Sequence, residues 1–161
     1  MGHLLEPRSS TTYKRILNEY ANYANRVSVN YQFNYKIICT NLFKSDISFI
    51  LNKKTYKICI FYNHNYPFVP PLNIKINNID IDIYYNNIMK NNNDIFDKCL
   101  CCESLLCINN WAVNKDIENI MEEIIKIINY SYLSIYKILL KKIFNKYTNE
   151  SVDYLNNYLI M

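Results

Sequence analysis

The stretch YKICIFYNHNYPFVPP, residues 56–71, decides the fold of this chain. Its first half is rich in isoleucine and aromatic residues, which favour a strand. Its second half contains three of the chain's four prolines. Prolines at this density fix an extended path and cannot lie inside a helix or a central strand. The stretch therefore predicts a strand that ends in a rigid turn.

Runs of the same character lie on both sides of this turn. Upstream, Tyr31–Thr40, Asp46–Leu51 and Thr55–Tyr62 are rich in Ile, Phe, Tyr and Cys and are separated by short polar connections. Downstream, Leu72–Ile76 has the same composition. Short polar connections favour hairpins between neighbouring strands. The four runs predict a four-stranded antiparallel meander.

Helical spacing appears at both ends of the chain. Ile16, Leu17 and Tyr20 predict an amphipathic helix over about 12–25, and the apolar residues from Ile117 onward predict another. Further C-terminal helices are expected over about 131–146 and 150–159, with a break at Asn145–Asn149. Residues 77–98 show little periodicity and are expected to form a long irregular loop. The order of elements predicts an α+β fold.

The composition indicates one folded domain and excludes several classes of function. The chain has 161 residues, of which 50% are hydrophobic and 20% charged, so a real core is expected over residues 13–161. Residues 1–12 lack the Asn, Ile and Lys of the remainder and are expected to be disordered, added or truncated. A net charge of +4 without a basic block predicts no nucleic-acid partner. No apolar run is long enough for a membrane span, so no membrane partner is expected.

The single glycine, Gly2, has a consequence for the turns, which must rely on Asn and Asp to reach left-handed conformations. Six cysteines without a secretory signal predict a reducing compartment, with the cytoplasm as the expected location and the nucleus as an alternative. Targeting to an organelle stays open because a native N-terminal segment could be missing. Cys39 and Cys59 lie in apolar runs and are expected to be small buried side chains.

Four of the six cysteines fall in CLCCESLLCINNW, Cys99–Trp111. A reactive thiol, a metal site and plain packing are competing interpretations. Structural zinc sites usually combine two separated cysteine pairs, or cysteine with histidine. Here the cysteines are compressed into one short loop, and His3 and His64 lie far away in the sequence. Zinc is therefore the minority interpretation, and we expect neither a metal nor a cofactor.

At this point the chain resembles the ubiquitin-conjugating enzyme family in a divergent form, over about residues 14–128. The sequence KRILNE, Lys14–Glu19, is similar to the start of the family's first helix, and the turn YPFVPP, Tyr66–Pro71, is the most specific match. IYYNNI, Ile83–Ile88, is similar to a family segment that precedes the active site, although it lacks the usual His and Pro. CCESLL and the following Trp111 are similar to the active-site segment.

The resemblance implies a UBC-like fold and a thioester carrier. Such an enzyme accepts ubiquitin or a ubiquitin-like protein from an activating enzyme onto a cysteine and passes it to a lysine, usually with a ubiquitin ligase. An exposed cysteine on a loop suits this chemistry, because a thiolate is a good nucleophile and a thioester is reactive toward amines.

The alignment with the family assigns the catalytic roles. Pairing Leu105–Leu106 with the family's apolar pair makes Cys102 the nucleophile. Shifting the gap selects Cys101 instead, and Cys99 is a third alternative. Asn87 is the expected oxyanion donor, since a side-chain amide can stabilise developing negative charge. A loop asparagine that only shapes its own turn is an equally good interpretation of Asn87.

Partner surfaces also follow from the resemblance. Lys14 and Arg15 occupy positions that the family turns toward the activating enzyme. Phe68, with Ala112 and Val113, matches the patch that the family offers to ligases. Each has a simpler interpretation, as solvated charges for the first pair and as core packing for Phe68.

Several departures from the family favour a different class of function. The His-Pro pair, the usual glycine-rich hairpin and the acidic segment after the active-site helix are missing, and the loops on both sides of the cysteines are longer. A catalytically inactive ubiquitin-conjugating enzyme variant, or an RWD-like interaction domain, is therefore the alternative to an enzyme.

Overall fold

The computed structural model describes residues 11–27, 34–39, 43–91 and 100–159. Expectations about residues 1–10 and Cys99 lie outside these ranges. The strands are β1 (Asn34–Cys39), β2 (Phe43–Leu51), β3 (Lys54–Tyr62), β4 (Asn73–Ile76) and β5 (Ile79–Asp80). The helices are α1 (Thr11–Val27), α2 (Ile81–Asn91), α3 (Leu100–Glu103) and α4 (Ile117–Leu159). The α+β class predicted from the sequence is confirmed.

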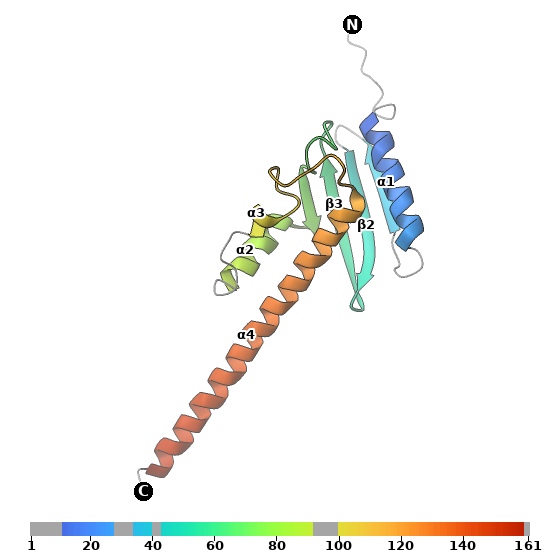
Figure 1. The fold of residues 1–161 in the computed structure, drawn as a ribbon. Coiled ribbons are helices and arrows are strands. Elements are labelled where there is room, and N and C mark those ends of the chain that lie inside the picture. Colours follow the sequence, from blue (N-terminus) through green and yellow to red (C-terminus); the bar gives the residue numbers. More distant parts are fainter. Residues whose placement is uncertain (1–10, 28–33, 40–42, 92–99, 160–161) are drawn as a thin grey trace.

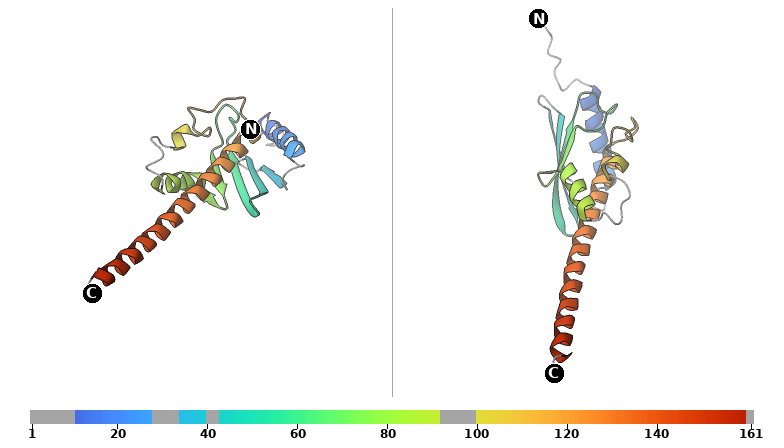
Figure 2. Two further views of the ribbon diagram at one scale, coloured as in Figure 1. Left: turned by 60° about the horizontal axis from the view of Figure 1, so that its bottom comes forward. Right: turned by 90° about the vertical axis from the view of Figure 1, so that its left-hand side faces the viewer.

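The sheet has five strands in sequence order, and each strand is antiparallel to the next. The helices lie on one face of this sheet and leave the other face uncovered (Figure 1, Figure 2). Strict alternation in β2 and β3 explains the arrangement, since successive side chains point to opposite faces. Ile47 and Ile58 are buried beneath the helices, whereas Lys44 and Lys57 lie on the uncovered face.

Asparagine and lysine form the tight turns of this sheet. The β2–β3 turn places Asn52 and Lys53 at φ values of 51° and 63°, and the β4–β5 turn places Asn77 and Asn78 at 51° and 66°. Two-residue hairpins need positive φ at both positions, a role usually given to glycine. The expectation that asparagine replaces glycine in the turns is therefore confirmed, with Lys53 as an unexpected addition.

The expectation of an irregular loop over 77–98 is wrong, because β5 and α2 occupy residues 79–91. The same strand makes the sheet five-stranded instead of the expected four-stranded meander. Ile81, Tyr85 and Ile88 are buried at helical spacing and attach α2 to the core. Only these three residues of α2 are described as buried, and Asn86 and Asn87 separate two of them. The helical spacing of apolar residues is therefore weak in the sequence.

The expected break at Asn145–Asn149 is also wrong, since α4 runs without interruption from Ile117 to Leu159. No glycine or proline interrupts this helix, and an asparagine costs less than about 1 kcal/mol in a helix interior. Its first turns bury Ile117, Ile120 and Ile124 against the sheet. Its second half projects away from the domain (Figure 1). Among the described helices, none is both long and apolar enough to cross a membrane.

Three buried hydroxyl groups cross the core between α1 and the sheet. The Tyr20 hydroxyl is hydrogen-bonded to Ser45 Oγ on β2 and lies 2.9 Å from the Tyr62 hydroxyl on β3. All three side chains are buried. Burial raises the pKa of both tyrosines well above the usual value, so these groups stay neutral and act only as hydrogen-bond partners.

We therefore expect Tyr20→Phe to lower the free energy of unfolding by about 2 kcal/mol, because two buried hydroxyls lose their shared partner. Urea denaturation measures this change. Tyr136→Phe is the matched control, since Tyr136 is 66% exposed on α4. Equal stability of the two variants would contradict the buried network.

Candidate active site

A buried tyrosine holds the proline turn against α1. The Tyr66 side chain is 1% exposed, and its hydroxyl donates to Glu19 Oε2 at 2.6 Å. Arg15 Nε donates to the other carboxylate oxygen of Glu19, also at 2.6 Å. From the same helix, the Thr12 hydroxyl donates to the backbone carbonyls of His64 at 2.8 Å and Tyr66 at 3.1 Å. These contacts fix the turn on the helix.

The loop that precedes α4 is tied to the same place. Arg15 Nη2 donates to the carbonyl of Val113 at 2.9 Å and to that of Lys115 at 3.3 Å. The Trp111 indole N–H donates to the Pro67 carbonyl at 2.7 Å. Helix α1, the proline turn and the loop around Trp111 are therefore joined, and we call this set of contacts the clasp. Trp111 therefore has a structural role, because its indole N–H joins the two loops.

The buried carboxyl of the clasp carries an electrostatic cost. Burial raises the pKa of Glu19 above its ordinary value of 4.5, and the hydrogen bonds from Tyr66 and Arg15 offset part of this shift. Burial and the neighbouring carboxylate together raise the pKa of Tyr66, which therefore stays a hydrogen-bond donor. Glu19 keeps its position because two donors compensate for the lost water.

The cysteine-bearing loop folds back on itself after α3. The Ser104 side chain is buried, and its hydroxyl oxygen accepts from the Tyr85 hydroxyl of α2 at 2.6 Å. Asn110 Nδ2 donates to the carbonyl of Cys102 at 2.7 Å and to that of Ser104 at 2.9 Å. The backbone N–H of Trp111 donates to the Cys107 carbonyl at 3.0 Å. The loop is thus attached to α2 at one side and to the clasp at the other.

Cys102 is exposed at the edge of a hollow of about 260 Å³, which we call the thiol hollow. One wall comes from Leu72 and Ile74, at the exit of the proline turn and on β4, and another from Asp82 and Tyr85 on α2. Such a groove suits an extended chain segment with apolar contacts and one end at the thiol.

The other expected catalytic residues have different surroundings. Asn87 lies on the exposed side of α2, and it is absent from the described lining of the thiol hollow. Tyr85 and Ile88 face the core, and Asn87 points to a different side of α2. The Asn87 side chain therefore points away from the hollow. The backbone of Cys101 belongs to α3, while its side chain lies outside the described part of the structure. Cys107 is half-buried.

The residues expected to bind partners belong to the three segments that the clasp joins. Lys14 is exposed on α1 beside Arg15. Phe68 is 75% exposed, and Ala112 and Val113 are exposed on the other loop. The Trp111–Pro67 hydrogen bond joins these two loops, so Phe68 and the Ala112–Val113 pair belong to one region of the surface. Phe68 therefore does not pack as core.

Two site residues escaped the sequence analysis. Asn110 supplies the amide that holds the Cys102 carbonyl, and Asp82 places a carboxylate in the wall of the thiol hollow. The only available signal for Asn110 was its position beside Trp111, which is weak in a chain full of asparagine. Asp82 was hidden in the segment that the sequence analysis treated as a loop.

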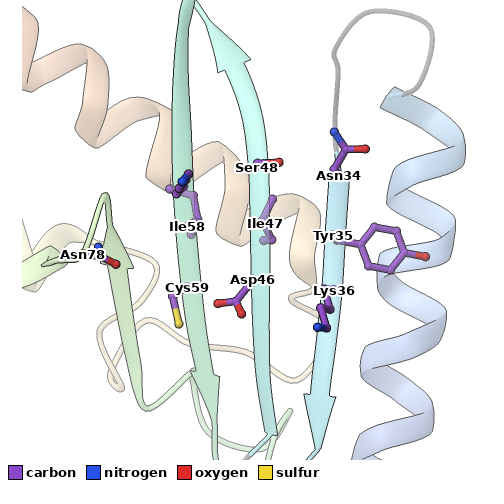
Figure 3. A pocket seen from close by; sticks show the side chains of 10 residues that line it. Asn34, Tyr35, Lys36, Asp46, Ile47, Ser48, Ile58, Cys59 and Asn78 are labelled. Carbon is purple, nitrogen blue, oxygen red and sulfur yellow. The ribbon is translucent and has the colours of Figure 1, made fainter.

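Another hollow lies on the uncovered face of the sheet, where Cys59 pairs with Asp46 across β3 and β2 (Figure 3). Cys59 is half-buried, as a residue facing a groove would be, and not fully buried as expected. Burial, with Asp46 nearby, raises the pKa of the Cys59 thiol to about 11. A thiol with this pKa is almost wholly protonated at neutral pH and makes a poor nucleophile.

In the ranges that the structure describes, no group of three or more His, Cys, Asp and Glu side chains could hold a metal ion. No protein-family model, curated protein or solved structure matches the chain.

We expect Glu19→Gln to change how stability depends on pH. Because the folded pKa of Glu19 is raised, the folded state holds the proton more tightly than the unfolded state. Glu19 therefore contributes fully to the stability of the folded state below pH 4.5. This contribution is lost as the pH rises through the raised pKa of Glu19 in the folded state. The neutral glutamine has no such loss, so the variant should gain on the wild type as pH rises.

Urea denaturation of both proteins between pH 4 and pH 8 measures this difference. Other titrating groups are common to the two proteins and cancel in the comparison. A stability difference that is independent of pH, or one that moves toward the wild type as pH rises, would refute the assignment.

We expect Asn110→Asp to loosen the cysteine loop, because a carboxylate would face the Cys102 and Ser104 carbonyls where an amide now donates. Amide hydrogen exchange at Cys107 and Trp111 should become about 5–10-fold faster, as expected for the loss of a hydrogen bond or two. Asn109→Asp adds the same charge at the neighbouring exposed position and serves as the control. Similar protection in both variants would show that Asn110 does not hold the loop.

Proposed function

We propose that this protein is a ubiquitin-conjugating-type acyl transferase with a UBC-like fold, in which Cys102 carries ubiquitin or a ubiquitin-like protein as a thioester. The observation that carries the proposal is the exposure of Cys102 at the edge of the thiol hollow, in α3, which leads into a loop anchored to the proline turn. The sequence resemblance of the turn and of the Cys102–Trp111 segment supports it. A cytoplasmic or nuclear location belongs to the same proposal.

The chemistry requires two acyl transfers. In the first, the Cys102 thiolate attacks the thioester carbonyl of the modifier on the activating enzyme. A new C–S bond forms, and the activating enzyme's cysteine leaves as a thiolate. In the second, a lysine amine attacks the Cys102 thioester, an amide forms, the Cys102 thiolate leaves and the amine loses a proton. No step needs a metal or a cofactor.

The walls of the thiol hollow suit these steps. Leu72, which is 62% exposed, offers an apolar contact for the modifier's extended C-terminal tail. Asp82, in the opposite wall, offers a carboxylate that attracts a lysine ammonium group toward the thioester. In this proposal Asp82 takes the part of the acidic segment that the sequence lacks.

The oxyanion donor is the weaker part of the proposal. Asn87 has the right chemistry but faces away from the wall of the hollow, and the Asn110 amide already binds two carbonyls. The position of Asn87 favours the alternative, an inactive variant or an RWD-like interaction domain that uses the Phe68 surface for binding alone. In the proposed enzyme, the surface for a ligase is formed by Phe68, Ala112 and Val113. The surface for the activating enzyme is formed by Lys14 and Arg15.

A charging assay distinguishes the enzyme from the interaction domain. The full chain is incubated with ATP and with ubiquitin or each of several ubiquitin-like proteins, each with its activating enzyme. We expect an adduct that thiol reagents cleave, with one member of this panel. Cys102→Ser should abolish the thiol-sensitive adduct completely, because any ester formed on the serine oxygen resists cleavage by thiols.

Cys107→Ser is the matched control, since it makes the same change at the half-buried cysteine of the same loop, and it should charge normally. Loss of the adduct in Cys101→Ser with retention in Cys102→Ser would move the nucleophile by one residue. Absence of an adduct with every member of the panel would refute the enzyme and leave the interaction domain.

A further inference from the structure

The second half of α4 stands clear of the domain (Figure 1, Figure 2). Beyond Ser134, which is buried, most described side chains up to Lys146 are exposed. An isolated helix exposed on all sides is expected to carry mainly polar residues. This one does not, and its large apolar residues need an explanation.

Apart from Ile135, the large exposed apolar residues described in this half of α4 form one continuous stripe. Leu133, Tyr136, Leu140 and Ile143 recur at steps of three and four residues, which places them on one side of a helix. Leu139 and Phe144 widen this side to an arc of roughly 140° at 100° per residue. Each of the six side chains is at least 50% exposed. We call this set the apolar stripe.

The apolar stripe is not a continuation of the face that packs on the sheet. Ile124, Ile127 and Ile128 are buried against the domain. At 100° per residue their mean direction lies roughly 130° from the centre of the stripe. The stripe therefore points away from the direction in which α4 meets its own core, and the domain does not cover it.

The charges beside the stripe all have one sign. Lys137, Lys141, Lys142 and Lys146 lie in this half of the helix, and no Asp or Glu occurs between Glu123 and Glu150. Lys137 lies next to Phe144 at one edge of the stripe, and Lys146 lies next to Leu139 at the other edge. A lysine stem can follow an apolar surface while its ammonium group stays in a polar layer.

This charge pattern selects the occupant. Two copies packed through the stripe would bring lysines of the same charge close together at its edges, which disfavours self-association. A surface that is apolar in its interior and anionic at its boundary matches both features. Lipid bilayers with anionic headgroups have this layered chemistry, and helices with an apolar face flanked by lysines lie in their interface.

We propose that the projecting half of α4 binds the surface of an anionic membrane, with the apolar stripe inserted among the acyl chains and Lys137 and Lys146, at its two edges, at the headgroups. The sequence analysis expected no membrane partner, because it searched for a spanning segment only. Surface binding needs no span. This proposal is independent of the chemistry at Cys102.

Co-sedimentation of the full chain with vesicles tests the proposal. We expect binding to vesicles of 70% phosphatidylcholine and 30% phosphatidylserine, and at least tenfold weaker binding to vesicles of phosphatidylcholine alone. Leu140→Asn with Ile143→Asn should reduce binding to the anionic vesicles more than tenfold. Both residues are 50% exposed, so circular dichroism should show an unchanged fold.

Lys137→Gln with Lys146→Gln should reduce binding by about 25-fold at low salt, since each lysine near an anionic surface is worth about fivefold. Lys53→Gln with Lys57→Gln removes the same charge from exposed positions on the sheet and should change binding little. Equal binding to both kinds of vesicle, or none to either, would overturn the proposal. A dimer that the Asn variant dissociates, without vesicle binding, would assign the stripe to a second copy and would also overturn it.

Discussion

The arrangement of the whole site depends on one buried carboxylate. Glu19 receives hydrogen bonds from the Tyr66 hydroxyl and from Arg15, and Arg15 then reaches the carbonyls of Val113 and Lys115. A carboxylate in this position is costly unless it is fully hydrogen-bonded, so the three segments have one arrangement in which the cost is offset. The edge of the Trp111 ring system adds a contact with Tyr66, with ring centroids 5.9 Å apart. Segments that are far apart in the chain are thereby held in a fixed relation.

That relation explains why two cysteines of one small domain differ so strongly. Cys102 lies in the short helix α3, just before a loop whose polar groups bond to one another and to α2, and its side chain is exposed. Cys59 lies within a strand, where burial raises its pKa to about 11. The Cys102 side chain is therefore exposed to solvent, and the Cys59 side chain in the sheet is half-buried. A reactive thiol needs access and a thiolate population. Cys102 has access, whereas partial burial and a raised pKa limit both of these at Cys59.

The sequence predicted best those segments whose composition has one structural explanation. The Ile-rich and aromatic composition of Thr55–Tyr62 and the density of prolines at Pro67–Pro71 predicted a strand that ends in a turn, and both are present. It failed where the period was diluted, as in α2, or where a composition shift resembled a break, as at Asn145 in α4. The contacts of Thr12 and Asn110 with backbone carbonyls could not be predicted, because carbonyl positions depend on how distant segments pack. For the same reason Asn87 could be given a role from its residue type but not a direction.

The central claim is that α3 and the loop after it leave the Cys102 thiol exposed, while the Cys107 thiol of the same loop is half-buried. Brief reaction of the folded wild-type protein with isotope-coded iodoacetamide at neutral pH, followed by peptide mapping, gives a separate alkylation rate for each cysteine. The account predicts the fastest rate at Cys102, a slower rate at half-buried Cys107 and the slowest of these three at Cys59. Faster alkylation at Cys101, Cys107 or Cys59 than at Cys102 would contradict it.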